Sequence, residues 1–339
     1  MNLKDFSRLL GLSPTTVSRA LNGYPEVNSN TRQRVIEAAR RHGYAPNQAA
    51  KRLATGRAMS VGHVVPLAAY QYINPHFADF ISGAGEVYSA AGYDMVLSVV
   101  PAEEEEACYR ALVAQGRVDG IMVHSPRWLE PRIDLLCELG MPFLVHGRAG
   151  HEDGYSWIDI NNRRAFQRAT DLLLDLGHRR IAFLNGLADM SFAHRRMLGY
   201  QAALVERGLP FDPALVHNAE MIESYGHDCT LQLLAGKDAP TAFIAASSIV
   251  AYGILRAIRE RGLQLGRDIS IITHDDDLTF LKDSGSVPLF TATRSSIRAA
   301  GRRAAELLKE LIAEGPGAER RELWEAELRI GQSTGPHRA

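Results

Sequence analysis

The stretch from Pro14 to Asn22 gathers polar side chains whose types and spacing suit hydrogen bonding to a nucleic acid. The Arg19 guanidinium can bond N7 and O6 of one guanine together, a contact that discriminates this base by about 1 to 3 kcal/mol. Thr15 offers one hydroxyl and a methyl group, whereas Pro14 offers apolar contact only. For the threonines, an ordinary solvated helix face is an equally good explanation.

Three short helices would position these side chains. The first has its apolar residues at helical spacing and ends before Gly11, and the second should run from Pro14 to about Leu21 behind the N-cap Ser13. A third should run from about Ser29 to Arg41 after the N-cap Asn28. Two helices joined by so short a turn, the second of them polar, form a helix-turn-helix pattern. A small protein-binding helical bundle is the alternative.

Charge separates the chain into two parts near residue 58. Residues 1 to 58 hold ten Lys and Arg but three Asp and Glu, a formal charge of +7. The remainder holds 28 basic and 36 acidic residues, a formal charge of -8. A basic module joined to an acidic one indicates that the first alone meets a polyanion, although a merely solvated basic surface has the same composition.

Length and composition are those of a globular protein: 339 residues, 46% of them hydrophobic, suffice for two or three domains. No run of about 18 apolar residues predicts a membrane span, and the N-terminus lacks the layout of a signal peptide. We therefore expect a cytoplasmic protein. The three cysteines are too few and too scattered for a disulfide framework or a zinc cluster.

From residue 61 onward, apolar runs alternate with amphipathic stretches, the pattern of a parallel α/β fold. The runs expected as strands are Val61–Pro66, Asp94–Val100, Gly120–His124, Pro142–His146, Ile181–Leu184, Ala242–Ala246 and Ile269–Thr273. The main helices expected between them are Phe77–Ala91, Glu103–Gln115, Asn162–Gly177, Arg195–Arg207 and Val250–Arg261. Two doubly wound lobes result, and a ligand would bind between them, outside the carboxyl ends of the strands.

An enzyme is the alternative from another class, and the motifs do not favour it. The sequence has no Gly-x-Ser-x-Gly elbow, no P-loop and no metal-ligand spacing, and Gly83-Ala84-Gly85 lacks the third glycine of a dinucleotide fingerprint. We therefore expect no catalytic residues, metal or cofactor. A periplasmic transport receptor would share the core, but it would need a signal peptide and has no use for a basic headpiece.

The motifs and their order resemble the lactose-repressor (LacI/GalR) family over nearly the whole chain. The runs that carry the resemblance are Gly11–Asn22, Val27-Asn28, Thr31-Arg32, Gly43–Asn47, Gly177–Ile181, Arg196–Tyr200, Gly266–Ser270 and Thr273–Asp276. The sequence departs from the family at Asp5-Phe6-Ser7, where Asp-Val-Ala is usual.

The resemblance implies a helix-turn-helix headpiece over residues 1–46, a hinge helix over 47–58, and a periplasmic-binding-protein-like core of two doubly wound parallel-sheet lobes. The N-terminal lobe would comprise 61–161 plus about 292–325, and the C-terminal lobe 162–291 plus about 326–339. The chain would then pass between the lobes near Asn161, near Thr291–Arg294 and around Leu328–Ser333.

The family pattern also implies a homodimer on a pseudo-palindromic operator DNA. The residues that would contact DNA are Pro14, Thr15, Thr16, Ser18, Arg19, Asn22, Asn28, Thr31, Asn47, Ala50 and Leu53. In the family, a hinge leucine, matched by Leu53, wedges between base pairs in the minor groove. A helix shorter than about 12 residues is marginal alone, so the hinge should form only when DNA and a partner pack against it. A passive tether is the alternative.

A small sugar effector, controlling operator affinity from the cleft between the lobes, is the further implication. Arg196 and Asp275 match the family's effector-binding arginine and carboxylate, groups that bond vicinal hydroxyls bidentately. The full set of ligand-binding candidates is Arg196, Asp275, His146, Arg148, Trp157, Tyr72, Ser125 and Ser247.

Two departures from the family pattern bear on the effector. Ser247-Ser248 replaces a common Asn-Asp pair, and His146-Gly147-Arg148 replaces a strand ending in Asp. The latter, with Trp157, looks like the members that respond to α-glucosides such as trehalose or maltose. A phosphosugar or a nucleobase as effector, and activation instead of repression, remain alternatives.

Overall fold

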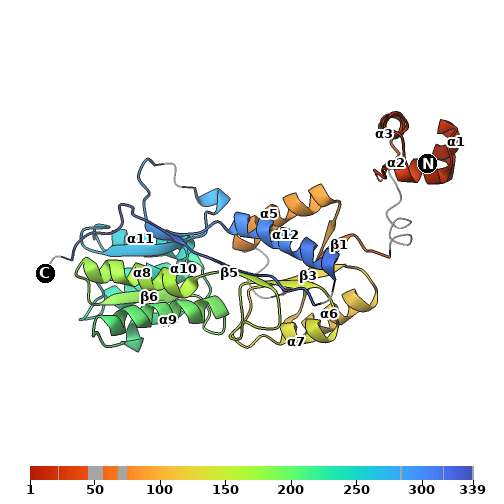
Figure 1. Cartoon of the computed structure of the whole chain (residues 1–339). Helices are drawn as coiled ribbons and strands as arrows, with labels where there is room; N and C mark the ends of the chain where they lie inside the picture. The colour runs from red at the N-terminus through yellow and green to blue at the C-terminus, as the bar shows by residue number, and fades with distance from the viewer. Residues whose placement is uncertain (22, 45–55, 68–74, 283–284, 316, 338–339) are drawn as a thin grey trace. The chain divides into compact units, whose positions relative to one another are not determined.

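The computed structural model describes residues 1–21, 23–44, 56–67, 75–282, 285–315 and 317–337 (Figure 1). Packing divides the chain into two compact units, Met1–Met59 and Ser60–Ala339, here called the headpiece and the core. Asn22, Tyr72 and most of the expected hinge, with Asn47, Ala50 and Leu53, lie outside the described residues.

The headpiece consists of three helices, α1 (Leu3–Leu10), α2 (Pro14–Leu21) and α3 (Ser29–His42), which confirms the predicted elements. Each begins at a side-chain cap. The amide of Asp5 donates to Asn2 Oδ1 at 2.9 Å, that of Thr16 to Ser13 Oγ at 3.0 Å, and that of Asn30 to Asn28 Oδ1 at 2.8 Å. Gly11 and Gly43 end α1 and α3 at φ of 63° and 59°, a backbone conformation that favours glycine.

One small apolar cluster holds these helices together. Phe6 is fully buried in this cluster, and its ring stacks on that of Tyr44, with the two ring centroids 4.2 Å apart. The other buried members are Val17, Ala20, Val27, Val35 and Ala39. Phe6, which stands where the family usually has Val, is thus the largest fully buried side chain of this core, and its aromatic ring buries more apolar area than Val.

The N-terminal lobe is built on a six-stranded parallel sheet in the order β11-β5-β4-β3-β1-β2. Its strands are β1 (Ser60–Pro66), β2 (Asp94–Val100), β3 (Gly120–His124), β4 (Phe143–His146), β5 (Trp157–Ile160) and β11 (Arg321–Trp324). Helices α5 (Pro75–Ala91) and α12 (Ile297–Glu314) pack on one face. Helices α6 (Glu105–Ala114) and α7 (Pro131–Glu138) pack on the other, so both faces are covered.

The C-terminal lobe repeats this plan in the order β12-β10-β9-β8-β6-β7, with β12 alone antiparallel to its neighbour. Its strands are β6 (Ile181–Asn185), β7 (Val216–Asn218), β8 (Ala242–Ala245), β9 (Ser270–Asp275), β10 (Thr291–Arg294) and β12 (Glu327–Arg329). One face carries α8 (Asn162–Asp175) and α9 (Ser191–Glu206), the other α10 (Glu223–Leu234) and α11 (Ser248–Glu260). Short 3-10 turns complete the core at Ala102–Glu104, Pro213–Leu215 and Thr279–Leu281.

The chain passes between the lobes after β5, after β10 and after β11, so both lobes are discontinuous. The lobe boundary expected near residue 292 falls inside β10, which pairs with β9 in the C-terminal sheet. The last crossing, expected around Leu328–Ser333, comes earlier, between Trp324 and Glu327, because β12 already pairs with β10. At β10 the strand pairing continues beyond the expected boundary. At β12 it begins before Leu328, close to residue 326, where the C-terminal lobe was expected to resume.

Candidate functional site

A cavity of about 160 Å³ lies between the two lobes, where the carboxyl ends of β3, β4, β5 and β9 face one another. In doubly wound folds this is the edge of the sheet at which ligands bind. The lining side chains include polar groups from both lobes: His76, His124, Ser125, His146, Arg148, Asp159, Asn162, Arg196, His274 and Asp276. Phe77, Phe80, Phe192, Ile160, Met221 and Ile297 supply the apolar part of the wall.

Arg196 on α9 is held rigidly in the C-terminal wall of this cavity. Its Nε donates to Asn162 Oδ1 at 2.7 Å and its Nη1 to the carbonyl of Ala246 at 2.8 Å. The guanidinium also lies 4.7 Å from the ring centroid of Phe166 and 4.8 Å from that of Phe192. Burial lowers the pKa of Arg196 to about 10, which still leaves it charged at neutral pH. The wall thus presents a fixed, desolvated cation.

Asp276 supplies the carboxylate of the cavity. Its Oδ2 lies 2.9 Å from His76 Nε2 of α5, and its Oδ1 lies 3.4 Å from His274 Nε2. Burial opposes its ionisation, but the two histidines hold the pKa of Asp276 well below the ordinary value. The sequence had indicated the preceding residue, Asp275. That side chain is not part of the cavity lining and lies 3.4 Å from Arg294 Nε, since successive side chains along a strand point to opposite sides.

Two neutral histidines form the N-terminal wall opposite Arg196. His124 ends β3 and His146 ends β4, so the two lie on paired strands. Burial lowers the pKa of His146 to about 4, and burial together with neighbouring positive groups holds that of His124 well below 6.5. The Phe80 ring packs against both, with centroid distances of 5.0 Å to His124 and 4.3 Å to His146. This wall therefore offers uncharged nitrogen atoms in an aromatic setting.

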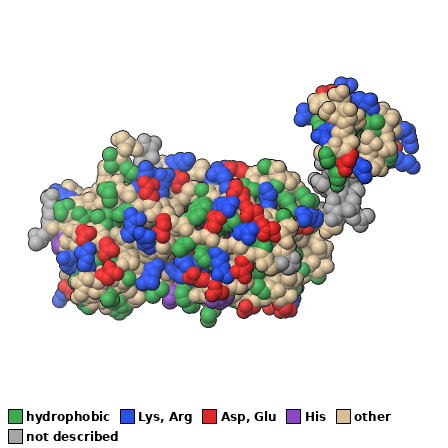
Figure 2. Space-filling view, viewed as in Figure 1, with side chains coloured by type: hydrophobic (Ala, Val, Ile, Leu, Met, Phe, Trp, Pro, Cys, Tyr) green, Lys and Arg blue, Asp and Glu red, His purple; other side chains and the backbone are tan. Residues whose placement is uncertain are grey.

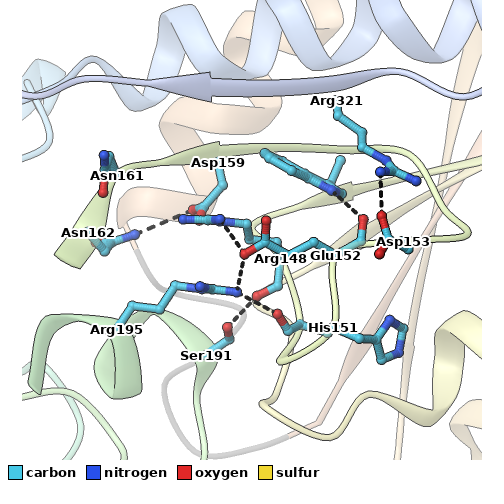
Figure 3. A network of polar contacts seen from close by, with 12 residues as sticks. Arg148, His151, Glu152, Asp153, Asp159, Asn161, Asn162, Ser191, Arg195 and Arg321 are labelled. Atoms are coloured by element: carbon cyan, nitrogen blue, oxygen red, sulfur yellow. Dashed lines mark hydrogen bonds and ion pairs between the residues drawn. The ribbon is translucent and has the colours of Figure 1, made fainter. Parts of the chain in front are cut away.

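Arg148 is already engaged by two carboxylates, although it lines the cavity (Figure 3). Its Nε donates to Asp159 Oδ2 at 2.9 Å and its Nη1 to Glu152 Oε1 at 2.5 Å. Burial raises the pKa of Asp159, and the hydrogen bond from Arg148 opposes this rise. Trp157 lies beneath the guanidinium, 5.2 Å from ring centroid to Cζ, and donates from Nε1 to the carbonyl of Glu152. Trp157 thus supports Arg148 and is not itself part of the lining.

Polar contacts hold the lobes together beside the cavity. Arg195 Nη2 donates to the carbonyl of Ala149 at 2.7 Å and lies 3.2 Å from Glu152, while Ser191 Oγ donates to the carbonyl of Arg148 (Figure 3). These contacts join the start of α9 to the segment after β4. The N-terminal and C-terminal walls of the cavity are therefore tied to each other on this side.

A second set of contacts joins the lobes through α5. The amide and hydroxyl of Thr279, in the segment after β9, both donate to the Asp79 carboxylate at 2.7 Å. The contact between His76 Nε2 and Asp276 Oδ2 joins the same two segments. Since Asp276 is itself part of the cavity wall, a ligand that displaces His76 would change the contact between the lobes.

Of the remaining predicted ligand residues, one lines the cavity. Ser125 follows β3 at a φ of 47°, and Arg132 supports this turn by donating from Nη2 to the carbonyl of His124 at 3.2 Å. Ser247 is fully buried and does not line the cavity. It caps α11 instead, since its Oγ accepts from Val250 N at 3.4 Å.

Sequence reasoning missed several polar lining residues: His76, His124, Asp159, Asn162, His274 and Asp276. One signal was present for His124, because it ends a predicted strand just as His146 does. The others lie at the ends of strands or at the starts of helices, in positions that only the packing of two lobes brings to one cavity.

The headpiece displays its candidate DNA-binding residues on α2. Pro14, Thr15 and Arg19 are exposed, whereas the Thr16 hydroxyl pairs with Ser13 Oγ at 2.8 Å. Asn28 uses its Oδ1 to cap α3. On the visible face of the headpiece Lys and Arg outnumber acidic side chains, while both signs intermingle over the core (Figure 2).

Among the residues that the structure describes, no cluster of three or more His, Cys, Asp or Glu side chains is arranged to hold a metal ion. Within the same part of the chain, no helix combines the length and apolar character of a membrane span.

A helix-turn-helix headpiece followed by a two-lobed core with an interlobe cavity defines a DNA-binding regulator with a ligand-binding domain of periplasmic-binding-protein type. Residues 2–47 match the bacterial regulatory proteins of the lacI family, and residues 170–334 match the periplasmic binding protein-like domain. The chain belongs to the LacI family of bacterial regulatory proteins.

Curated relatives agree over the full length. The chain is 47% identical to the HTH-type transcriptional regulator AglR of Rhizobium meliloti, covering 99% of this chain and 95% of the relative. It is 32% identical to the HTH-type transcriptional regulator RafR of Escherichia coli, covering 92% of each. These relatives are transcriptional regulators and not enzymes, as the sequence motifs predict.

Solved structures agree as well. A complex of the transcriptional regulator CelR with cellobiose matches with a TM-score of 0.72 at 28% identity, covering 98% of this chain and 99% of that one. The lac repressor dimer bound to operator and the anti-inducer ONPF matches with a TM-score of 0.80 at 25% identity, covering 99% of each.

Proposed function

We propose that this protein is a transcriptional repressor in the cytoplasm that binds operator DNA as a homodimer and whose operator affinity is controlled by a neutral sugar bound between the core lobes. The observation that carries the proposal is the interlobe cavity, in which Arg196 and Asp276 present fixed, opposite charges to one enclosed space. Vicinal hydroxyls both accept from a guanidinium and donate to a carboxylate, so a sugar satisfies both of these side chains.

The charge balance of the cavity favours a neutral effector over a phosphosugar. Arg148 is bound by Asp159 and Glu152, whereas Arg196, the other arginine of the lining, forms no ion pair with a carboxylate of the described residues. A phosphate near Arg196 would also face the Asp276 carboxylate at the cost of charge repulsion. The likeness to AglR and to the CelR complex with cellobiose supports a sugar, and among sugars we favour an α-glucoside.

Operator recognition would come from α2 in the major groove. Arg19 is the base-reading residue of choice, with Thr15 and Pro14 beside it, while Ser18, Asn22, Asn28 and Thr31 would position the headpiece on phosphates. Asn47, Ala50 and Leu53 of the hinge would reach the minor groove. Two headpieces are needed for a pseudo-palindromic site.

A homodimer is supported by the surface of the N-terminal lobe. Strand β2 is the sheet edge, and its Leu97 and Val99 are 51% and 43% exposed. An edge strand with neighbouring exposed apolar side chains offers a surface on which another chain can pack. The likeness to the lac repressor dimer supports the same assembly.

The test begins with selection of a high-affinity operator from random duplexes by the full-length protein. Fluorescence anisotropy with that operator then measures affinity in the presence of trehalose, maltose, sucrose or cellobiose, beside a thermal-shift assay of the same sugars. We expect one sugar to raise Tm and to weaken operator binding. A sugar that raises Tm and strengthens operator binding would replace induction by corepression, and silence of all sugars would overturn the effector class.

A further inference from the structure

A third histidine lies behind the N-terminal wall of the cavity. His63 on β1 is fully buried and is not part of the cavity lining. Its Nδ1 lies 2.8 Å from Nε2 of His124, the histidine that does line the cavity. The hydrogen bond between them uses one nitrogen of each ring. The second nitrogen of His63, Nε2, is buried, and the second nitrogen of His124, Nδ1, is available to a ligand.

Both rings are neutral. Burial lowers the pKa of His63 to about 3, and burial with nearby His63, His146 and Arg132 keeps that of His124 well below its ordinary value. Each neutral ring carries one proton and one lone pair, so the shared hydrogen bond has two possible directions. In one direction His63 Nδ1–H donates, and in the other His124 Nε2–H donates.

The interior end of the pair decides between these directions. His63 Nε2 is buried and has no hydrogen-bond partner among the described residues. If His124 donated, the proton of His63 would sit on Nε2 and a buried N–H would lack an acceptor, which folded proteins tolerate less often than a bare acceptor. The proton of His63 therefore belongs on Nδ1, where it is donated to His124 Nε2.

We propose that His63 is a positioning residue that holds His124 in the Nδ1–H tautomer, so that His124 donates a hydrogen bond to an oxygen of the effector. This inference rests on the proposed function, because it assigns a role within the same cavity. The N-terminal wall would then demand an acceptor oxygen, while Asp276 in the C-terminal wall demands a donor. A ligand that both donates and accepts, as a sugar does through its hydroxyls, meets both walls.

The tautomer itself is measured without any ligand. Long-range ¹H–¹⁵N correlation spectra of full-length protein with ¹⁵N-labelled histidine distinguish Nδ1–H from Nε2–H for each ring, and single substitutions assign the signals. We expect the Nδ1–H form for both His63 and His124. An Nε2–H signal, or a mixture of tautomers, at His124 would overturn the inference whether or not any sugar binds.

A matched pair of substitutions tests the positioning role. In His63→Asn the amide Nδ2 lies near the place of Nδ1 and can still donate to His124, whereas His63→Phe cannot. We expect His63→Asn to keep the His124 tautomer and the affinity for maltose, the probe in calorimetric titration. In His63→Phe, His124 should no longer be held in the Nδ1–H tautomer, and maltose binding should weaken by about 2- to 10-fold, the effect of one neutral hydrogen bond.

His151→Gln is the control, since this side chain is exposed and lies outside the cavity lining. It should change neither the His124 tautomer nor the affinity. Equal maltose affinity of His63→Phe and wild type would contradict the positioning role. Should maltose fail to bind wild-type protein, the same titrations use whichever of trehalose, sucrose and cellobiose raises Tm. If none of the four sugars binds, the effector class of the proposed function fails, while the ligand-free spectrum still decides the tautomer.

Discussion

The headpiece and the interlobe cavity differ in how they hold their functional side chains. In the headpiece, Pro14, Thr15 and Arg19 are exposed and belong to a single helix of eight residues. In the cavity, Arg196 and Asp276 are held by partners from other segments, including Asn162, Ala246 and His76. A surface that meets a large polyanion can leave its side chains solvated until the partner arrives, whereas a cavity for a small neutral ligand must pre-arrange polar groups away from water.

This contrast predicts that the two functions separate under mutation. The largest effect should come from the headpiece core, where Phe6→Ala removes a fully buried ring that stacks on Tyr44. Such a truncation costs about 3 to 5 kcal/mol, more than a core of so few residues can lose. We expect the headpiece to unfold, and operator binding to disappear, while sugar binding stays intact. Fluorescence anisotropy measures operator binding and a thermal-shift assay measures sugar binding, both on one preparation of the variant. Leu9→Ala is the control, because Leu9 is 54% exposed.

The reverse separation is expected for Arg196→Ala. Loss of charge-assisted hydrogen bonds to the effector, each worth about 1.5 to 3 kcal/mol, should weaken sugar binding by roughly 10- to 100-fold or more. Operator binding without sugar should persist, and sugar should no longer release it. Isothermal titration calorimetry measures sugar affinity, and fluorescence anisotropy measures operator affinity. Arg163→Ala, on the exposed face of α8, is the matched control. Unchanged sugar affinity in Arg196→Ala would move the effector site away from this cavity.

Arg19→Ala sharpens the comparison from the DNA side. We expect a loss of about 1 to 3 kcal/mol in operator affinity with little change in binding to random duplex, because a base contact is removed and few phosphates are affected. The ratio of the two affinities at several salt concentrations is the measurement. Arg8→Ala, at an exposed side chain paired with Asp5, serves as the control. An equal loss on both duplexes would identify Arg19 as a phosphate contact instead.

The smallest effect should be a pH dependence of the core alone. In the folded core His146 has a pKa of about 4 and His63 of about 3, both below the value of 6.5 expected after unfolding. Below pH 6.5 the unfolded chain therefore binds more protons, so stability falls as pH falls from about 6.5 toward 4. By pH 5.5 each histidine should cost about 1 kcal/mol.

Differential scanning calorimetry from pH 7.5 to 5 measures this loss. A His146→Gln variant should have a flatter dependence of core Tm on pH than wild type. An equally steep dependence in that variant would mean that other groups titrate. The headpiece has no buried histidine among its described residues, so its transition should respond less over the same range.

Local signals in the sequence predicted much of the fold. Asn2, Ser13 and Asn28 cap helices whose ends depend on residues within one turn, so α1, α2 and α3 lie where the pattern indicates. Strand β3 matches its predicted limits because a parallel strand buried between helices reads as a continuous apolar run. The edge strand β2 also matches its predicted limits.

The lobe boundaries show where local signals stop. The limits of β10 and β12 depend on pairing with each other and with β9, partners distant in sequence. No property of residues 291–294 alone states which sheet they join.

The sequence by itself determined the class of fold, the short helix that exposes Arg19, and the choice of Arg196, which the structure places at the cavity. Tertiary structure alone decided that Asp276 lines the cavity in place of Asp275, that Trp157 supports Arg148, and that His63 stands behind His124. The physical reason is the distance along the sequence over which each interaction acts. A helix cap or an apolar period acts over a few residues, whereas the direction of a strand-end side chain and the partner of a buried polar atom depend on segments that meet only when two lobes pack together.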